Sequence, residues 1–147
     1  MHEQPTEEVR AVVQRITGYR FRSRFHLRRH EQAIVARDGM KLIRIHAADL
    51  LGARLAPAYP RNDGKQTPWG GHPVFRAQHA TGTCCRGCLY RLHGIATGRA
   101  LTAAELDYVC DVVCCWIGME MADGPAVSPP PVPRRRSARG SGQGTLF

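Results

Sequence analysis

The chain has 147 residues, of which 43 % are apolar and ten are aromatic, and this size fits a single small domain. Its 21 basic side chains outnumber its 12 acidic ones, so the net charge is +9. No uncharged apolar run is long enough to span a membrane, and charges occur throughout residues 1–30, so we expect a soluble, cytoplasmic protein without a secretory signal. A balance this basic favours polyanionic partners, nucleic acid above all, although an arginine-rich proteome would produce it too.

Composition divides the chain into two parts. Residues 124–147 contain five of the ten prolines, four arginines, no acid and few large apolar side chains. Such a segment cannot bury enough apolar surface to offset the entropy lost on ordering. The composition therefore predicts one domain over residues 1–123, followed by a disordered basic tail over 124–147.

Four segments of the domain have helical periodicity, namely residues 6–17, 27–37, 40–55 and 102–117. Gly18, Gly39 and Pro57 follow the first three segments, as helix terminators do. At the start of the fourth segment, Thr102 and Glu105 have the spacing of a capping box. We expect a mainly α fold in which about four helices surround one core.

The connection between the third and fourth predicted helices, residues 56–100, has a different character. It is rich in glycine, proline, histidine and cysteine, and it is too long for an ordinary loop. Bound metal, a bound ligand or internal hydrogen bonds must hold such a connection in place. We therefore expect a long irregular segment that is stabilised by a metal ion.

The densest group of potential metal ligands lies in the sequence HATGTCCRGCLYRLH, residues 79–93. A CxxC spacing lets two thiolates reach one ion, and a histidine follows five residues later. The predicted zinc ligands are Cys84, Cys85, Cys88 and His93. His79 and His72 are alternative fourth ligands. An iron–sulfur cluster, a disulfide, structural cysteines and a nucleophilic Cys84 or Cys85 activated by His79 stay open as other interpretations.

Three more cysteines lie in the fourth predicted helix. Cys110 and Cys114 are four residues apart on its apolar stripe, where a free cysteine behaves as a small apolar side chain, and we expect both in the core. Cys115 lies nearer the polar face, and its role stays open. His46 points toward the buried side of the third helix, and we expect a hydrogen-bonded core histidine there and not a ligand.

Residues 54–78 carry more polar side chains than a turn needs. The sequence Asn62-Asp63-Gly64 indicates a tight turn, but turn chemistry does not explain the donors around it. In an enzyme, an aspartate with a histidine would activate water or hold a divalent ion for phosphodiester hydrolysis, and a lysine would attack a sugar aldehyde. The candidate catalytic residues are Asp63, Lys65, His72 and His79.

Nucleic-acid contacts are predicted for two regions. Five arginines in residues 20–29 alternate with aromatic side chains, which is typical of a surface that contacts phosphates, although a solvated basic face has the same pattern. The donors of residues 54–78 suit phosphate or base-edge contacts, and Trp69 or Phe75 offers a stacking face. The candidate nucleic-acid-binding residues are Arg22, Arg24, Arg28, Arg54, Arg61, Gln66 and Gln78.

A longer motif starts at this polar segment and reads NDGKQTPWGGHPVFRAQHATGTCCRGCLYRLHGI. It resembles the signature of a bacterial and phage family known only as a domain of unknown function, over roughly residues 20–118. The resemblance implies no activity and no catalytic residues. The chain departs from the pattern at Leu92, where the family has aromatic side chains, and in the cysteines of residues 102–117.

The final residues offer an independent indication. Gln143, Leu146 and Phe147 resemble the QxxLF peptide with which bacterial polymerases and repair proteins bind the DNA sliding clamp, and the flexible tail would keep such a peptide accessible. A short motif of this type also arises by chance.

These observations lead to one main hypothesis. We expect a zinc-binding, DNA-associated protein of repair or replication that is recruited by the sliding clamp. A nuclease and a glycosylase/lyase are the enzymatic forms of this hypothesis. Two alternatives belong to other classes: a non-enzymatic adaptor with a structural zinc ion, and a cysteine-dependent enzyme that acts on a small molecule.

Overall fold

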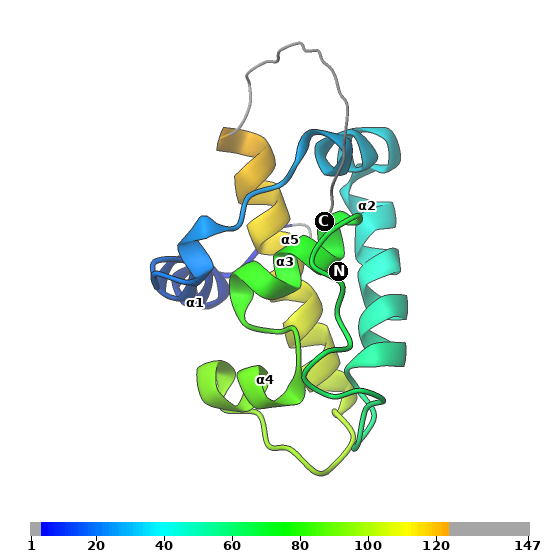
Figure 1. The fold of residues 1–147 in the computed structure, drawn as a ribbon. Coiled ribbons are helices and arrows are strands. Elements are labelled where there is room, and N and C mark those ends of the chain that lie inside the picture. The colour runs from blue at the N-terminus through cyan, green and yellow to red at the C-terminus, as the bar shows by residue number, and fades with distance from the viewer. Residues whose placement is uncertain (1–3, 124–147) are drawn as a thin grey trace, which may run out of the picture.

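The computed structural model of the chain describes residues 4–123, so the predicted tail and its motif residues Gln143, Leu146 and Phe147 lie outside the described part. The described residues form helices and no strand, as expected, but they form five α-helices instead of four. The elements are α1 (Glu7–Thr17), the short 3-10 helix η1 (Arg22–Arg24), α2 (Arg29–Arg54), α3 (Pro73–Thr81), α4 (Arg86–His93) and α5 (Ala103–Asp123) (Figure 1).

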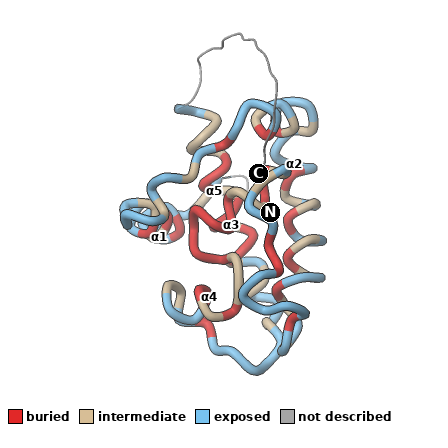
Figure 2. Tube along the Cα trace, in the orientation of Figure 1, coloured by how far each residue is buried: buried red, intermediate tan, exposed pale blue. Residues whose placement is uncertain are grey.

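Helix α5 lies at the centre of the fold, where it packs against α1, α2 and α3 (Figure 1). Its side chains Val109, Val113 and Ile117 are fully buried in an apolar core shared with Val13 of α1 and Leu51 of α2. Figure 2 shows that α3 is buried along most of its length, whereas α2 is buried along one side only. None of the helices in residues 4–123 combines the length and the hydropathy needed to cross a bilayer.

The first and last helices confirm the sequence predictions. Thr6 caps α1 by accepting a hydrogen bond from the amide of Val9 at 3.2 Å, and Gly18 ends the helix. At the start of α5, the Glu105 amide donates to Thr102 Oγ1 and the Thr102 amide donates to Glu105 Oε1, both at 3.0 Å. These ends were predictable because a cap depends on residues only three positions apart.

Helix α2 joins two segments that the sequence predicted as separate helices. Gly39 lies inside it with φ 82° and ψ 157°, a conformation that interrupts the helical path and that glycine adopts without a steric cost. The break after Asp38 was therefore predicted correctly, but the chain resumes its helix at once. The result is one kinked helix that runs along one side of the molecule (Figure 1).

The prediction of one long irregular segment over residues 56–100 was wrong, because two helices lie within it. Helix α3 begins with Pro73 after the capping residue His72, and it ends at Gly82, whose φ of 70° is left-handed. Helix α4 begins after Cys85 and ends at Gly94 with φ 71°. Two of the glycines that suggested a loop, Gly82 and Gly94, are helix ends in the left-handed conformation.

Candidate metal centre

Three cysteines meet at the start of α4. Cys84 and Cys85 come directly before the helix and Cys88 lies in its first turn, and their sulfur atoms all lie within 4.8 Å of one another. The local reason is that Cys85 caps the helix: its Sγ accepts a hydrogen bond from the Cys88 amide at 3.4 Å. This group, the cysteine triad, can hold a metal ion.

Two guanidinium groups contact the triad. Arg22, from the distant element η1, places Nη2 at 3.3 Å from Cys88 Sγ and Nη1 at 3.9 Å from Cys84 Sγ. Arg91, one helical turn after Cys88, places Nη2 at 3.4 Å from the same sulfur. The pKa of Cys88 is lowered, first by the hydrogen bond from Cys84 and then by that from Arg22. The pKa of Cys84 is raised, by its hydrogen bond with Cys88 and by burial. These contacts favour the thiolate form at Cys88 over that at Cys84.

Arg86, between the cysteines, holds the triad to the rest of the fold. Its side chain is fully buried and donates to carbonyls of two separate segments, with the shortest bonds to Ala96 at 2.7 Å, Pro57 at 2.8 Å and Arg99 at 2.9 Å. Nothing in the sequence pattern marks Arg86 as a functional residue. An arginine between two ligand cysteines gives no signal of burial, because its carbonyl partners come from residues 55–57 and 96–99.

Asp63 has a structural role at the same helix. Its Oδ1 accepts hydrogen bonds from the Arg86 amide and from Gln66 Nε2, each at 3.1 Å. The predicted turn is present, because the Lys65 amide donates to the Asn62 carbonyl at 2.7 Å. Lys65 itself is exposed on this turn. Asp63 therefore ties the turn to the start of α4.

His93 does not join the triad. Its Nδ1 lies 2.7 Å from the Tyr108 hydroxyl and its Nε2 lies 2.8 Å from the Thr81 carbonyl, so both ring nitrogens are engaged. Burial lowers its pKa, which favours the neutral ring. The structure thus places the expected fourth ligand in a bridge between α3, α4 and α5, away from the sulfur atoms.

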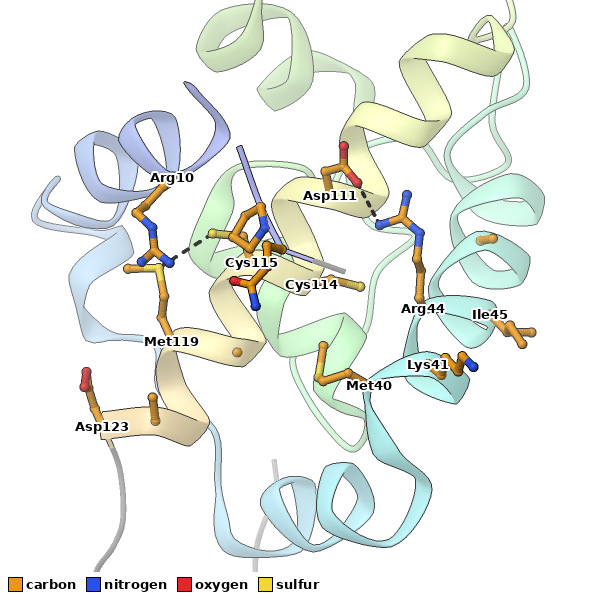
Figure 3. Close-up of a pocket in the computed structure, with 15 residues that line it drawn as sticks. Arg10, Met40, Lys41, Arg44, Ile45, Asp111, Cys114, Cys115, Met119 and Asp123 are labelled. Carbon is orange, nitrogen blue, oxygen red and sulfur yellow. Dashed lines mark hydrogen bonds and ion pairs between the residues drawn. The ribbon is translucent and has the colours of Figure 1, made fainter. Parts of the chain in front are cut away.

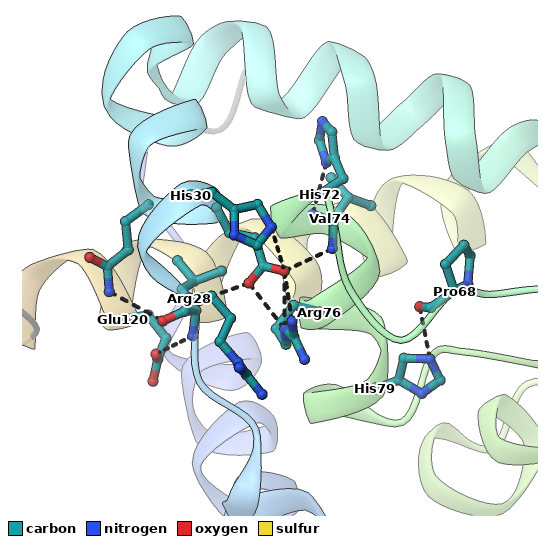
Figure 4. Close-up of polar contacts among 12 residues, drawn as sticks. Arg28, His30, Pro68, His72, Val74, Arg76, His79 and Glu120 are labelled. Atoms are coloured by element: carbon teal, nitrogen blue, oxygen red, sulfur yellow. Dashed lines mark hydrogen bonds and ion pairs between the residues drawn. The ribbon is translucent and has the colours of Figure 1, made fainter. Parts of the chain in front are cut away.

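His79, an alternative ligand, is engaged as well. Its Nε2 lies 3.1 Å from the carbonyl oxygens of Thr67 and Pro68, and burial lowers its pKa (Figure 4). Its ring stacks on Trp69 at 4.1 Å between centroids and on Phe25 at 5.8 Å. This aromatic stack is connected to the triad, because Arg22 donates to the His79 carbonyl at 2.7 Å.

His72 and His46 form a separate pair, with ring centroids 5.5 Å apart. His72 caps α3: its Nδ1 accepts from the Val74 amide at 3.1 Å (Figure 4). The prediction that His46 is a hydrogen-bonded core histidine was wrong. Its Nδ1 is buried without a hydrogen-bond partner among residues 4–123, and Asp38 Oδ2 lies 3.9 Å away.

Two residues that were predicted to contact nucleic acid are buried among residues 4–123. Gln78 is 1 % exposed and donates to the Thr83 carbonyl at 2.9 Å. Gln66 is 9 % exposed and accepts from the Gly64 amide at 2.8 Å. Both amides hold loop backbone in place.

The predicted arginines differ in their surroundings. Arg24, Arg28 and Arg61 are exposed, and Arg24 lies over the Phe21 ring. Arg54 donates to the Gln66 carbonyl at 3.0 Å. Arg22 alone among the predicted arginines contacts the triad within residues 4–123.

A buried ion pair fixes the loop that precedes α3. Glu31 is fully buried and accepts from Arg76, from the Arg28 amide and from the Gly71 amide (Figure 4). Burial raises the pKa of Glu31, but these hydrogen bonds outweigh burial and lower it. The segment that carries Trp69 is thereby tied to α2.

A pocket of about 1350 Å³ lies on another part of the molecule, between the start of α1, the second half of α2 and the end of α5 (Figure 3). Met40, Cys114 and Met119 give it a largely apolar lining. Arg44, on its wall, pairs with Asp111 at 2.7 Å. The pocket lacks a group of metal-ligating side chains such as the triad, as far as residues 4–123 are concerned.

These features define a small α-helical protein with a three-cysteine cluster that can hold a metal ion. A model of a domain of unknown function, DUF4186, matches residues 10–118, and the chain belongs to this family. The match confirms the resemblance to a family of unknown function and begins ten residues earlier than expected. No solved structure matches the chain. Because the family description assigns no activity, the function must be inferred from the site.

Proposed function

We propose that this chain is a zinc protein that binds DNA, with one zinc ion held by Cys84, Cys85 and Cys88. The convergence of the three sulfur atoms within 4.8 Å carries this proposal. In a tetrahedral site with zinc–sulfur bonds of about 2.3 Å, neighbouring sulfurs lie about 3.8 Å apart. The triad is thus near the spacing of a single ion, whereas an iron–sulfur cluster binds its cysteines through different iron atoms and spreads them farther apart.

A surface beside the triad supports the proposal that the protein binds DNA. Tyr19 and Phe21 are each 44 % exposed and Trp69 is 59 % exposed, and Arg24 lies among them over the Phe21 ring. Exposed aromatic rings stack on bases, and arginines contact phosphates. Arg22 joins this surface to the triad through the His79 carbonyl. The zinc ion would hold a nucleic-acid-binding surface in shape.

Binding is favoured over cleavage by the positions of the candidate catalytic residues. Asp63 and His72 cap helices, and His79 is buried against two carbonyls. Residues in these positions stabilise the fold and do not converge on one reacting bond. We therefore propose that the protein binds DNA as a non-enzymatic adaptor.

The sliding clamp is part of the proposal on sequence grounds alone. Gln143, Leu146 and Phe147 match the pattern of a clamp-binding peptide. Deletion of residues 143–147 should abolish binding of the full chain to a purified bacterial clamp in surface plasmon resonance. Undiminished binding after the deletion would contradict the clamp contact and leave the zinc and DNA parts intact.

The zinc and DNA parts are tested together on the full chain. Elemental analysis should find about one zinc ion per chain. Fluorescence anisotropy should then show DNA binding that weakens with salt, and Arg24→Gln should weaken it and reduce the salt slope by about one. Arg37→Gln is the matched control, since Arg37 is an exposed arginine of α2 that pairs with Asp38. Equal weakening by both variants would show general charge attraction and would refute a defined DNA surface.

A further inference from the structure

The cysteine triad supplies three donors, and the structure points to where the fourth comes from. We propose that the metal ion held by Cys84, Cys85 and Cys88 takes its fourth ligand from outside the chain, and that this ligand is a phosphate oxyanion held by Arg22 and Arg91. The inference rests on the proposed zinc centre and adds a ligand class to it.

The first argument is the shortage of protein donors. Among residues 4–123, the group of converging ligand atoms contains only the three sulfurs. Both ring nitrogens of His93 are hydrogen-bonded, to Tyr108 and to the Thr81 carbonyl. The Nε2 of His79 is hydrogen-bonded to two backbone carbonyls, and neither histidine belongs to the converging group. The segment 124–147 contains no histidine, cysteine, aspartate or glutamate. Outside the described residues, only His2 and Glu3 offer such a group.

The second argument is charge. A divalent ion with three thiolates carries one net negative charge, whereas the guanidiniums of Arg22 and Arg91 bring two positive charges into contact with Cys88 Sγ. The surplus positive charge suits an anion at the fourth position. Guanidinium groups bind phosphate oxygens through two parallel hydrogen bonds, so phosphate fits this pair better than a halide does.

The third argument is access. Cys84 and Cys85 are partly exposed, and Arg91 is exposed. Gly87 keeps the approach clear: a Cβ there would lie 3.3 Å from Arg91 Nη1 and 3.9 Å from Cys85 Sγ. The start of α4 adds the positive end of a helix dipole on the same side. An oxyanion can therefore reach the metal between Arg91 and the cysteines.

The experiment uses the full chain with cobalt(II) in place of zinc, because cobalt absorption bands respond to the fourth ligand. Titration with inorganic phosphate should produce a saturable change in these bands. Arg91→Gln should raise the phosphate concentration at half-saturation about tenfold, and Arg91→Lys should restore part of the affinity. Gly87→Ala should also weaken phosphate binding, because the added methyl group occupies part of the approach. Arg37→Gln should leave the affinity for phosphate unchanged. Circular dichroism and cobalt stoichiometry show that each variant folds and keeps its metal.

The outcomes separate this inference from the zinc proposal. Bound cobalt with bands that do not respond to phosphate would overturn the oxyanion inference and leave the metal centre standing. The cobalt bands could instead change when His2 and Glu3 are replaced by alanine and stay unchanged with phosphate. That result would overturn the oxyanion inference and show that the chain itself supplies the fourth ligand. Failure to bind cobalt or zinc would refute the metal centre, and the inference would fall with it. A DNA strand with a 5′-phosphate, compared with the same strand without one, distinguishes a terminal phosphate from the phosphodiester backbone.

Discussion

The six cysteines form two groups of three, and the groups differ in almost every physical respect. In the triad, Cys85 caps a helix, and guanidinium groups stand beside Cys88. Cys110, Cys114 and Cys115 lie within α5, where burial raises the pKa of Cys110 to about 11 and that of Cys114 to about 12. The first group can hold a cation, whereas the second has the properties of apolar packing.

The comparison teaches that cysteine spacing matters less than the backbone around it. At a helix start, amides point toward the sulfurs and the first turn brings positions three apart together. Inside a helix, the amides are used by the helix itself, and the cysteines face whatever packs there. Cys115 contacts Met119 at 3.8 Å, and Cys110 is 3 % exposed. The core position predicted for Cys110 is confirmed, whereas Cys114 is only partly buried and lines the pocket.

The largest expected effect comes from removing one cysteine of each group. Cys85→Ser should reduce bound zinc at least tenfold and lower the free energy of unfolding by more than about 4 kcal/mol, because metal binding is coupled to folding. Cys114→Ser should keep full zinc content and cost about 1 kcal/mol or less. Elemental analysis and urea unfolding measure both quantities. Equal loss of zinc from the two variants would contradict the claim that the triad binds the metal ion and the cysteines of α5 do not.

The next effect tests how the triad is anchored. Arg86→Met leaves the carbonyls of Pro57, Ala96 and Arg99 without their buried donor. We expect a loss of about 3 kcal/mol in urea unfolding, since unsatisfied buried polar groups are costly. Arg99→Met is the control, because the exposed Arg99 side chain pairs with Glu105 at the surface. A variant of Arg86 as stable as the wild type would show that the carbonyl network does not anchor the triad.

The two groups of cysteines should also differ in thiol reactivity. With a raised pKa of about 12, roughly one Cys114 side chain in 100,000 is a thiolate at pH 7, whereas the pKa of Cys88 is lowered. Iodoacetamide should therefore label Cys88 of chelator-treated protein at least about 100-fold faster than Cys114, as measured by peptide mass spectrometry. Circular dichroism checks that the treated protein is folded. Similar labelling rates for Cys88 and Cys114 would contradict the lowered pKa of Cys88 and the raised pKa of Cys114.

A smaller effect concerns a region outside both groups. The folded pKa of Glu31 is lowered from 4.5, so its stabilisation is present above the unfolded pKa and is lost as the pH falls through the folded pKa. Glu31→Gln should cost about 2 kcal/mol at pH 7, and the difference from the wild type should shrink below about pH 4. Zinc content should not change. A difference that stays constant with pH would exclude the charge of Glu31 as its cause.

Sequence reasoning succeeded where the interaction was local. The caps of α1 and α5 and the convergence of Cys85 with Cys88 each depend on residues three positions apart. It failed for α3 and α4, because these helices have only nine and eight residues and lie between glycines. The usable signals were Pro73 at a helix start and the two glycines that end the helices, but they were interpreted as loop features.

The sequence alone determined that the chain is helical, where its first and last helices begin, and that Cys85 and Cys88 come together. Neighbouring residues decide these features through backbone geometry. Only the tertiary structure decided that Arg22 reaches the triad, that Arg86 is buried and that His93 is used elsewhere. These contacts join separate elements of the chain, Arg22 and Cys88 among them. They exist only because the helices pack around α5 in one particular arrangement, which no local pattern specifies.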